Sequence, residues 1–183
     1  WRFHLRDDVK FHDGEPMTAE DVKFTFDKMM DPTTDCPDLR NYYQDIASCD
    51  IIDPHTVKFT CKKPFFLHEI MLGDLSIIPK HVYSTGDFNN HPNNRAPIGS
   101  GPYKLEKWDT NQQLVFARNP DYWGKALGRE GHIDKFIWRI VLEDGAATQL
   151  ALRGELDSLP LLPKQWDVEG KLPEFEQQFN KFS

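Results

Sequence analysis

Residues 11–24 read FHDGEPMTAEDVKF, a turn followed at once by the start of a helix. Gly14 after Asp13 is a turn signature, because glycine adopts the backbone angles that such turns need. Thr18 can cap a helix, and Asp21, three residues later, can reach back to the cap. The acidic side chains of the first turn also suit the positive end of the helix dipole. We therefore predict a helix that begins just after Thr18.

The predicted helix has one apolar face. Apolar side chains recur there at helical spacing, at Val22, Phe26, Met29 and Met30. We expect the helix to end near Asp31-Pro32, because the residue before a proline avoids the helical region.

The rest of the chain mixes strand and helix patterns. The expected strands are residues 56–61, 103–108, 112–118, 135–142 and 155–159. A second helix is expected from Gly145 to Arg153, with Asp144 as its cap and Gly154 at its end. Residues 84–98 are dense in Asn, Pro and Gly and are the clearest candidate boundary. No internal repeat occurs, so a repeat array is excluded.

His12 and Asp13 could suggest a catalytic pair, because a carboxylate can orient an imidazole. Adjacent residues in a turn seldom face each other, and no nucleophilic Ser or Cys in a suitable context lies nearby. The sequence therefore favours a structural role for this segment. Many carboxylates are present, but their spacing selects no pair for glycoside hydrolysis.

Residues 99–103 read GSGPY and resemble a phosphate-binding loop only superficially. Pro102 removes a backbone N–H that an anion would need, and no Lys-Ser or Lys-Thr follows. The glycines are better explained by a close backbone approach, with Tyr103 presented beside it. Residues 118–124 read RNPDYWG, and we expect Tyr122 and Trp123 to cover a core edge rather than stack on a sugar or base.

The chain has 183 residues, with 29 acidic and 22 basic side chains and a net charge of −7. The basic residues are scattered rather than gathered into a stripe, so nucleic acid is not an expected partner. No uninterrupted apolar run approaches the roughly 20 residues that span a bilayer.

Three cysteines are present. Cys61 ends an alternating strand pattern, which favours a buried thiol. Cys36 and Cys49 lie in the polar stretch 31–50, where an exported protein could close a short loop, and either a bridge or two free thiols fits. A disulfide between Cys36 and Cys49 is therefore a hypothesis. Neither Cys-x-x-Cys nor His-x-x-x-His occurs, so no metal site is expected.

Taken together, residues 11–24, GSGPY followed by RNPDYWG, and a third stretch at 143–157 resemble the family 5 extracellular solute-binding proteins of ABC importers. The resemblance covers residues 1 to about 160. It implies a mixed α/β fold of the periplasmic-binding-protein type (class II, similar to cluster C), in which two lobes close over a ligand. Trp1 to Arg6 alternate as a strand does, and family members are longer, so we expect this chain to be a middle portion.

The resemblance also implies a division of the chain. Residues 1–96 would belong to the small subdomain of the first lobe, and residues 97–158 to the central sheet of that lobe. Residues 159–183 would begin the second lobe or the crossing to it. Because ligands collect near lobe crossings, Tyr103, Asp157, Leu159 and Leu161 are the expected ligand-binding residues.

The implied function is capture of a small solute, with a short peptide favoured, for delivery to an ABC permease in the membrane. Nickel complexes, opines and oligosaccharides are bound by relatives and stay open. The protein would be a monomer without cofactor or catalytic residues, located in the periplasm or outside the cell at the membrane. The alternatives are a ligand-sensing regulatory domain with the same fold and a carboxylate-dependent hydrolase.

Overall fold

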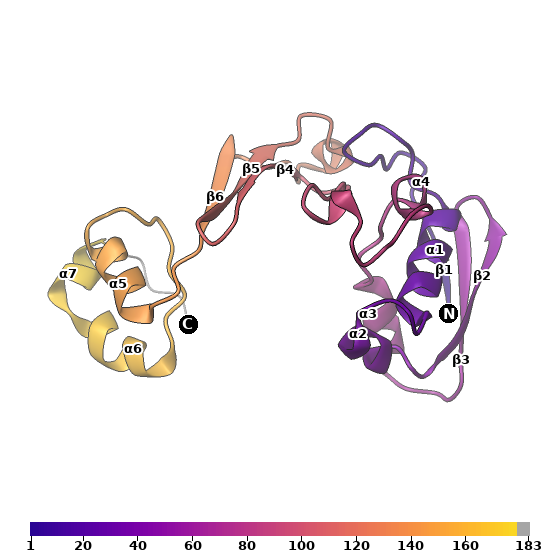
Figure 1. The fold of residues 1–183 in the computed structure, drawn as a ribbon, viewed down its shortest axis with the longest axis horizontal. Helices are drawn as coiled ribbons and strands as arrows, with labels where there is room; N and C mark the ends of the chain where they lie inside the picture. The colour runs from indigo at the N-terminus through magenta and orange to yellow at the C-terminus, as the bar shows by residue number, and fades with distance from the viewer. Residues whose placement is uncertain (179–183) are drawn as a thin grey trace. The chain divides into compact units, whose positions relative to one another are not determined.

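The computed structural model describes residues 1–178, which form two compact units (Figure 1). The first unit holds Trp1–Trp108 and Val115–Ile137, and the second holds Asp109–Leu114 and the chain from Trp138 onward. The predicted boundaries at residues 96 and 158 concern the lobes of a longer protein and stay a prediction. Residues 179–183 of the predicted third segment lie outside the described part of the chain.

α1 (Ala19–Met30) begins and ends where the sequence predicts. The Thr18 hydroxyl accepts a hydrogen bond from the Glu20 N–H at 3.3 Å, and the Asp21 carboxylate accepts one from the Thr18 N–H at 2.8 Å. This capping box satisfies backbone donors that a helix start otherwise leaves free. The predicted apolar face is confirmed by its buried members, Val22, Phe26 and Met29.

An antiparallel sheet underlies α1. Its strands are β1 (Arg2–His4), β2 (Ile46–Asp53) and β3 (Thr56–Cys61), in the order β1-β3-β2. Cys49 of β2 lies opposite Phe59 of β3, and α1 packs against both of these strands (Figure 1). The core of the first unit therefore lies between α1 and one face of the sheet, and Tyr43, Met71 and Leu72 complete it.

Short elements complete the first unit. They are α2 (Pro37–Tyr42), α3 (His68–Gly73), α4 (Lys80–Tyr83), η1 (Pro92–Asn94) and η2 (Trp123–Leu127).

A second sheet has the order β4-β5-β6, with strands β4 (Tyr103–Asp109), β5 (Gln113–Arg118) and β6 (Lys135–Arg139). These strands confirm the prediction for this region, although β6 ends three residues earlier than the predicted residue 142.

The second unit is mainly helical. It contains α5 (Asp144–Leu152), α6 (Pro163–Val168), η3 (Glu169–Lys171) and α7 (Pro173–Gln178). α5 contacts α7, and Ala151 and Phe175 are buried there. Among residues 1–178, no helix is long and apolar enough to cross a membrane.

Two predictions for residues 144–159 are wrong. Glu143, not Asp144, occupies the cap position of α5, and Asp144 is already helical. Residues 155–159 form no strand, because a strand needs a partner and no described segment pairs with them. Glu155 instead forms an ion pair with Arg139 at 3.2 Å.

The hypothesis of a Cys36–Cys49 bridge is also wrong, because all three cysteines are free. Cys49 is only 2% exposed and lies within β2. Acidic residues interrupt the apolar pattern of this strand, so the sequence did not indicate it. The Cys36 thiol instead donates a hydrogen bond to the Met29 carbonyl at 3.5 Å. Cys61 is partly rather than fully buried.

Candidate functional site

The sequence motifs of the first unit meet at one short segment, Gly99–Pro102, which leads into β4. Each of its four carbonyl groups accepts a hydrogen bond. The His12 N–H donates to the Gly99 carbonyl at 2.7 Å, and the Trp123 indole donates to the Ser100 carbonyl at 3.1 Å. The Gly101 carbonyl accepts from His12 Nε2 at 3.1 Å and from Asn119 Nδ2 at 3.2 Å. The Pro102 carbonyl accepts from the Asn119 N–H at 2.8 Å. We call this segment the crossing.

His12 binds the crossing with both ring nitrogens. The Gly99 N–H donates to Nδ1 at 3.2 Å, so the proton of the neutral ring is assigned to Nε2, which faces the Gly101 carbonyl. Burial lowers the pKa of His12, and the Lys104 ammonium lowers it further, against the hydrogen bond to Gly101 and the charge of Asp13, which raise it. The ring is therefore neutral around pH 7, as the double contact requires.

Asp13 binds a different residue. Its carboxylate lies 2.7 Å from Nε2 of His81 in α4. Burial raises the pKa of Asp13, but the hydrogen bonds from His81 and the Glu15 N–H outweigh it and leave the pKa below its usual value. His12 and Asp13 thus have separate partners, and each binds another segment of the first unit.

The RNPDYWG segment packs on the crossing, a contact that the sequence did not indicate. Asn119 is buried, and its backbone and side chain both donate to the crossing. The rings of Tyr122 and Trp123 are 5.1 Å apart, and the Arg6 guanidinium lies 5.3 Å from the Trp123 ring. These aromatic side chains are engaged within the first unit.

Tyr103 follows the crossing and is partly buried. Its hydroxyl accepts a hydrogen bond from the Ile133 N–H at 3.3 Å. A Cβ atom at Gly131 would lie 2.6 Å from the Tyr103 ring and would force it to shift, so glycine at this position lets the ring pack closely. These contacts fix the orientation of the side chain.

The other predicted ligand-binding residues belong to the second unit. Asp157 is exposed, whereas Leu159 and Leu161 are partly buried. Leu161 packs near Gly170, where an added Cβ would lie 3.5 Å from its methyl group. Because Tyr103 belongs to the first unit, the predicted convergence of these residues stays a prediction.

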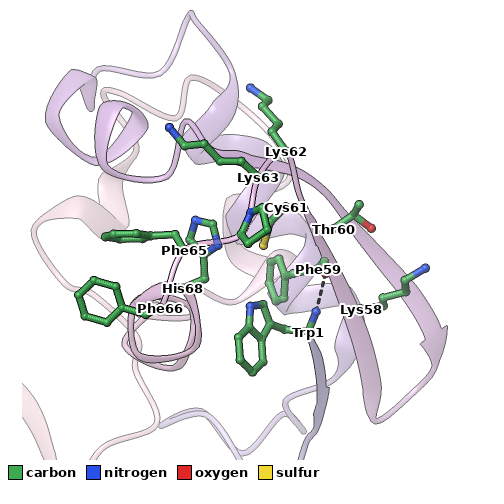
Figure 2. Close-up of a pocket in the computed structure, with 11 residues that line it drawn as sticks. Trp1, Lys58, Phe59, Thr60, Cys61, Lys62, Lys63, Phe65, Phe66 and His68 are labelled. Atoms are coloured by element: carbon green, nitrogen blue, oxygen red, sulfur yellow. Dashed lines mark hydrogen bonds between the residues drawn. The ribbon is translucent and has the colours of Figure 1, made fainter.

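An open groove lies between β3 and α3, and the sequence interpretation missed it. It has a volume of about 770 Å³. Figure 2 shows Phe65 and Phe66 on one side of it and Phe59 and Trp1 on the other. The buried His68 also lines the groove, and its Nε2 has no hydrogen-bond partner among the described residues. The run Lys-Lys-Pro-Phe-Phe at residues 62–66 is the signal that could have indicated it.

Lysines surround this groove. Lys62 donates to the Gln44 carbonyl at 2.6 Å, and Lys63 pairs with Asp45 at 3.1 Å, while their stems extend away from the aromatic rings (Figure 2). No group of three His, Cys, Asp or Glu side chains that could hold a metal ion occurs within residues 1–178.

Comparison with known proteins gives a family match over almost the whole chain. The model of bacterial extracellular solute-binding proteins, family 5 Middle, matches residues 1–181. The periplasmic oligopeptide-binding protein OppA of Salmonella typhimurium is 34% identical in an alignment 146 residues long that covers 69% of this chain and 26% of OppA.

Solved structures of other binding proteins are similar to this one, among them NikZ and CtaP. NikZ from Campylobacter jejuni, in complex with Ni(L-His), has a TM-score of 0.81 and 26% identity over 93% of this chain and 33% of NikZ. The ABC transporter substrate-binding protein CtaP from Listeria monocytogenes has a TM-score of 0.78 and 29% identity over 93% of this chain and 35% of CtaP. The chain therefore spans about a third or less of these relatives, and its predicted mixed α/β binding-protein fold is confirmed.

Proposed function

The chain belongs to the bacterial extracellular solute-binding proteins of family 5, and on this premise we propose that its full-length protein captures a small solute for an ABC permease. The family match over residues 1–181 carries this proposal. We favour a short peptide as the ligand. Main-chain groups can hold a peptide as an added strand while roomy pockets tolerate varied side chains, which suits a receptor with broad specificity.

The names of the relatives support a peptide and also a second ligand class. OppA is named as an oligopeptide-binding protein, whereas the structure of NikZ contains a nickel complex of histidine. A chelated metal ion is therefore the second candidate. It would arrive as cargo, bound with its own small-molecule ligand.

We place the ligand-binding face at Tyr103, Asp157, Leu159 and Leu161. The contacts of Tyr103 with Ile133 and Gly131 support this role, because they hold the ring in one orientation without using its whole surface. Asp157 is exposed and could meet the terminal ammonium of a peptide. Leu159 and Leu161 would contribute apolar surface.

The protein would act without catalysis, as a monomer in the periplasm or at the outer side of the cell membrane, with its ligand and the permease as partners. The separate partners of His12 and Asp13 argue against the triad that a hydrolase would need. A regulatory sensor would carry a DNA-binding or kinase module outside this segment, so the full-length sequence distinguishes that alternative.

Mass spectrometry of small molecules released from the purified full-length protein tests the ligand class. We expect peptides of about two to five residues, enriched over those released from an unrelated exported protein. Release of histidine together with nickel would favour the second candidate. A hydrolysis product that accumulates during incubation with peptides would contradict a binding protein.

A further inference from the structure

The crossing is held by a histidine whose contacts require one protonation state. We propose that His12 is the positioning residue of the crossing, and that protonation of its ring breaks the hydrogen bond from the Gly99 N–H, one of the two that His12 forms with Gly99. His12 thereby makes the order of the crossing dependent on pH. His12 lies outside the predicted set of ligand-binding residues.

The geometry supports this role because the two ring nitrogens have opposite tasks. Nδ1 accepts from the Gly99 N–H at 3.2 Å, and Nε2 faces the Gly101 carbonyl at 3.1 Å. Protonation would add a hydrogen to Nδ1, so that two donors would face each other. The contact with Gly101 would survive. Gly99 would lose its side-chain partner, while the bond from the His12 N–H to the Gly99 carbonyl would remain.

The charged groups around His12 act in both directions. Lys104 of β4 donates to the His12 carbonyl at 2.9 Å and disfavours a second positive charge nearby. Asp13 favours that charge, but it already binds His81 of α4. Burial is the largest influence and lowers the pKa of His12. The unfolded chain therefore binds a proton at His12 more readily than the folded protein does, at any pH between the folded pKa and the unfolded pKa.

The pKa of His12 in the folded protein lies below that in the unfolded chain, which is about 6.5. The stabilisation is therefore present above about pH 6.5 and is lost as the pH falls towards the folded pKa. Tyr103 directly follows the crossing, so a looser crossing would also disturb Tyr103. Only the effect on Tyr103 rests on the proposed function, according to which acid would weaken the capture of the solute.

Nuclear magnetic resonance of the ligand-free full-length protein, labelled with ¹⁵N-histidine, tests the proposal directly. The signal of His12 is assigned by its loss in His12→Gln. We expect the Nε2–H tautomer at about pH 7.5 and a titration midpoint below about 6.5. His81→Gln is the matched control, because it removes the histidine that binds Asp13 and should leave the tautomer of His12 unchanged.

Thermal unfolding gives the second readout. The melting temperature of the wild type should fall more between about pH 7.5 and pH 5 than that of His12→Gln, which retains a donor and an acceptor but does not titrate in this range. His12→Asn serves the same purpose if His12→Gln does not fold.

An Nδ1–H tautomer, a ring that is charged at neutral pH, or identical pH profiles for wild type and variant would overturn the proposal. Neither readout uses a solute, so this outcome is separate from a failure of the proposed function.

Discussion

At the scale of single residues, Tyr103 decides whether the predicted ligand-binding face is correct. In the full-length protein, Tyr103→Ala should weaken ligand binding by about 1–3 kcal/mol, the effect expected of an aromatic anchor. The ligand-free melting temperature should change little. Calorimetry and thermal unfolding of the same variant measure the two effects. Tyr103→Phe is the matched control for the hydroxyl that accepts from Ile133.

The alternative for Tyr103 is a packing role, which its contact with Gly131 would also explain. In that case Tyr103→Ala would lower the ligand-free melting temperature and leave the affinity intact. That result would remove Tyr103 from the ligand-binding face.

The cysteines give a second residue-scale prediction. Burial raises the pKa of the Cys49 thiol to about 12, so little reactive thiolate forms near neutral pH. Thiol labelling of the native protein should therefore modify Cys49 last. Labelling under denaturing, non-reducing conditions should count three free thiols in this part of the chain. A count of one would restore the bridge hypothesis.

At the scale of elements, the start of α1 depends on two side chains of unequal importance. Thr18→Ala removes the hydrogen bond from the Glu20 N–H and the one that the Thr18 hydroxyl donates to Asp21, and it should cost about 1 kcal/mol of unfolding free energy. Asp21→Ala should cost about 2–4 kcal/mol, because buried Asp21 accepts from the Thr18 N–H and also from the Lys80 N–H at 2.9 Å. Urea denaturation measures both. Equal losses would show that Asp21 acts only as part of the cap.

The elements that the sequence predicted well are those with local causes. Thr18 and Asp21 define the start of α1 through contacts three residues apart, and Pro32 ends it nearby. β2 was missed because Asp50 and Asp53 interrupt its apolar pattern, and only pairing with β3 makes it a strand. The predicted strand at residues 155–159 fails for the converse reason, since its pattern finds no described partner.

At the scale of the molecule, the motifs could be recognised in the sequence but their meeting place could not. His12 contacts Gly101 across 89 positions of sequence, and Asn119 reaches the same carbonyl from the other direction. Such contacts depend on the packing of the whole first unit. The groove between β3 and α3 is likewise a product of tertiary structure, because His68 and Phe59 come from different elements.

The limited length of the chain leads to a prediction about affinity. A binding protein with only one of its two lobes leaves one side of the ligand in water. It therefore lacks the buried contacts that supply affinity. Residues 1–183 alone should therefore give no heat of binding with pools of di- to pentapeptides. Micromolar binding by this piece would contradict the two-lobe account.

Capture of a small solute is the central claim, and calorimetry of the full-length protein tests it most directly. Titration with di- to pentapeptides should give saturable binding of one ligand per protein at a Kd of about 1 μM or tighter, about −8 kcal/mol. Titration with nickel–histidine in parallel decides between the two ligand classes. A folded full-length protein that binds neither peptides nor nickel–histidine saturably would contradict the account.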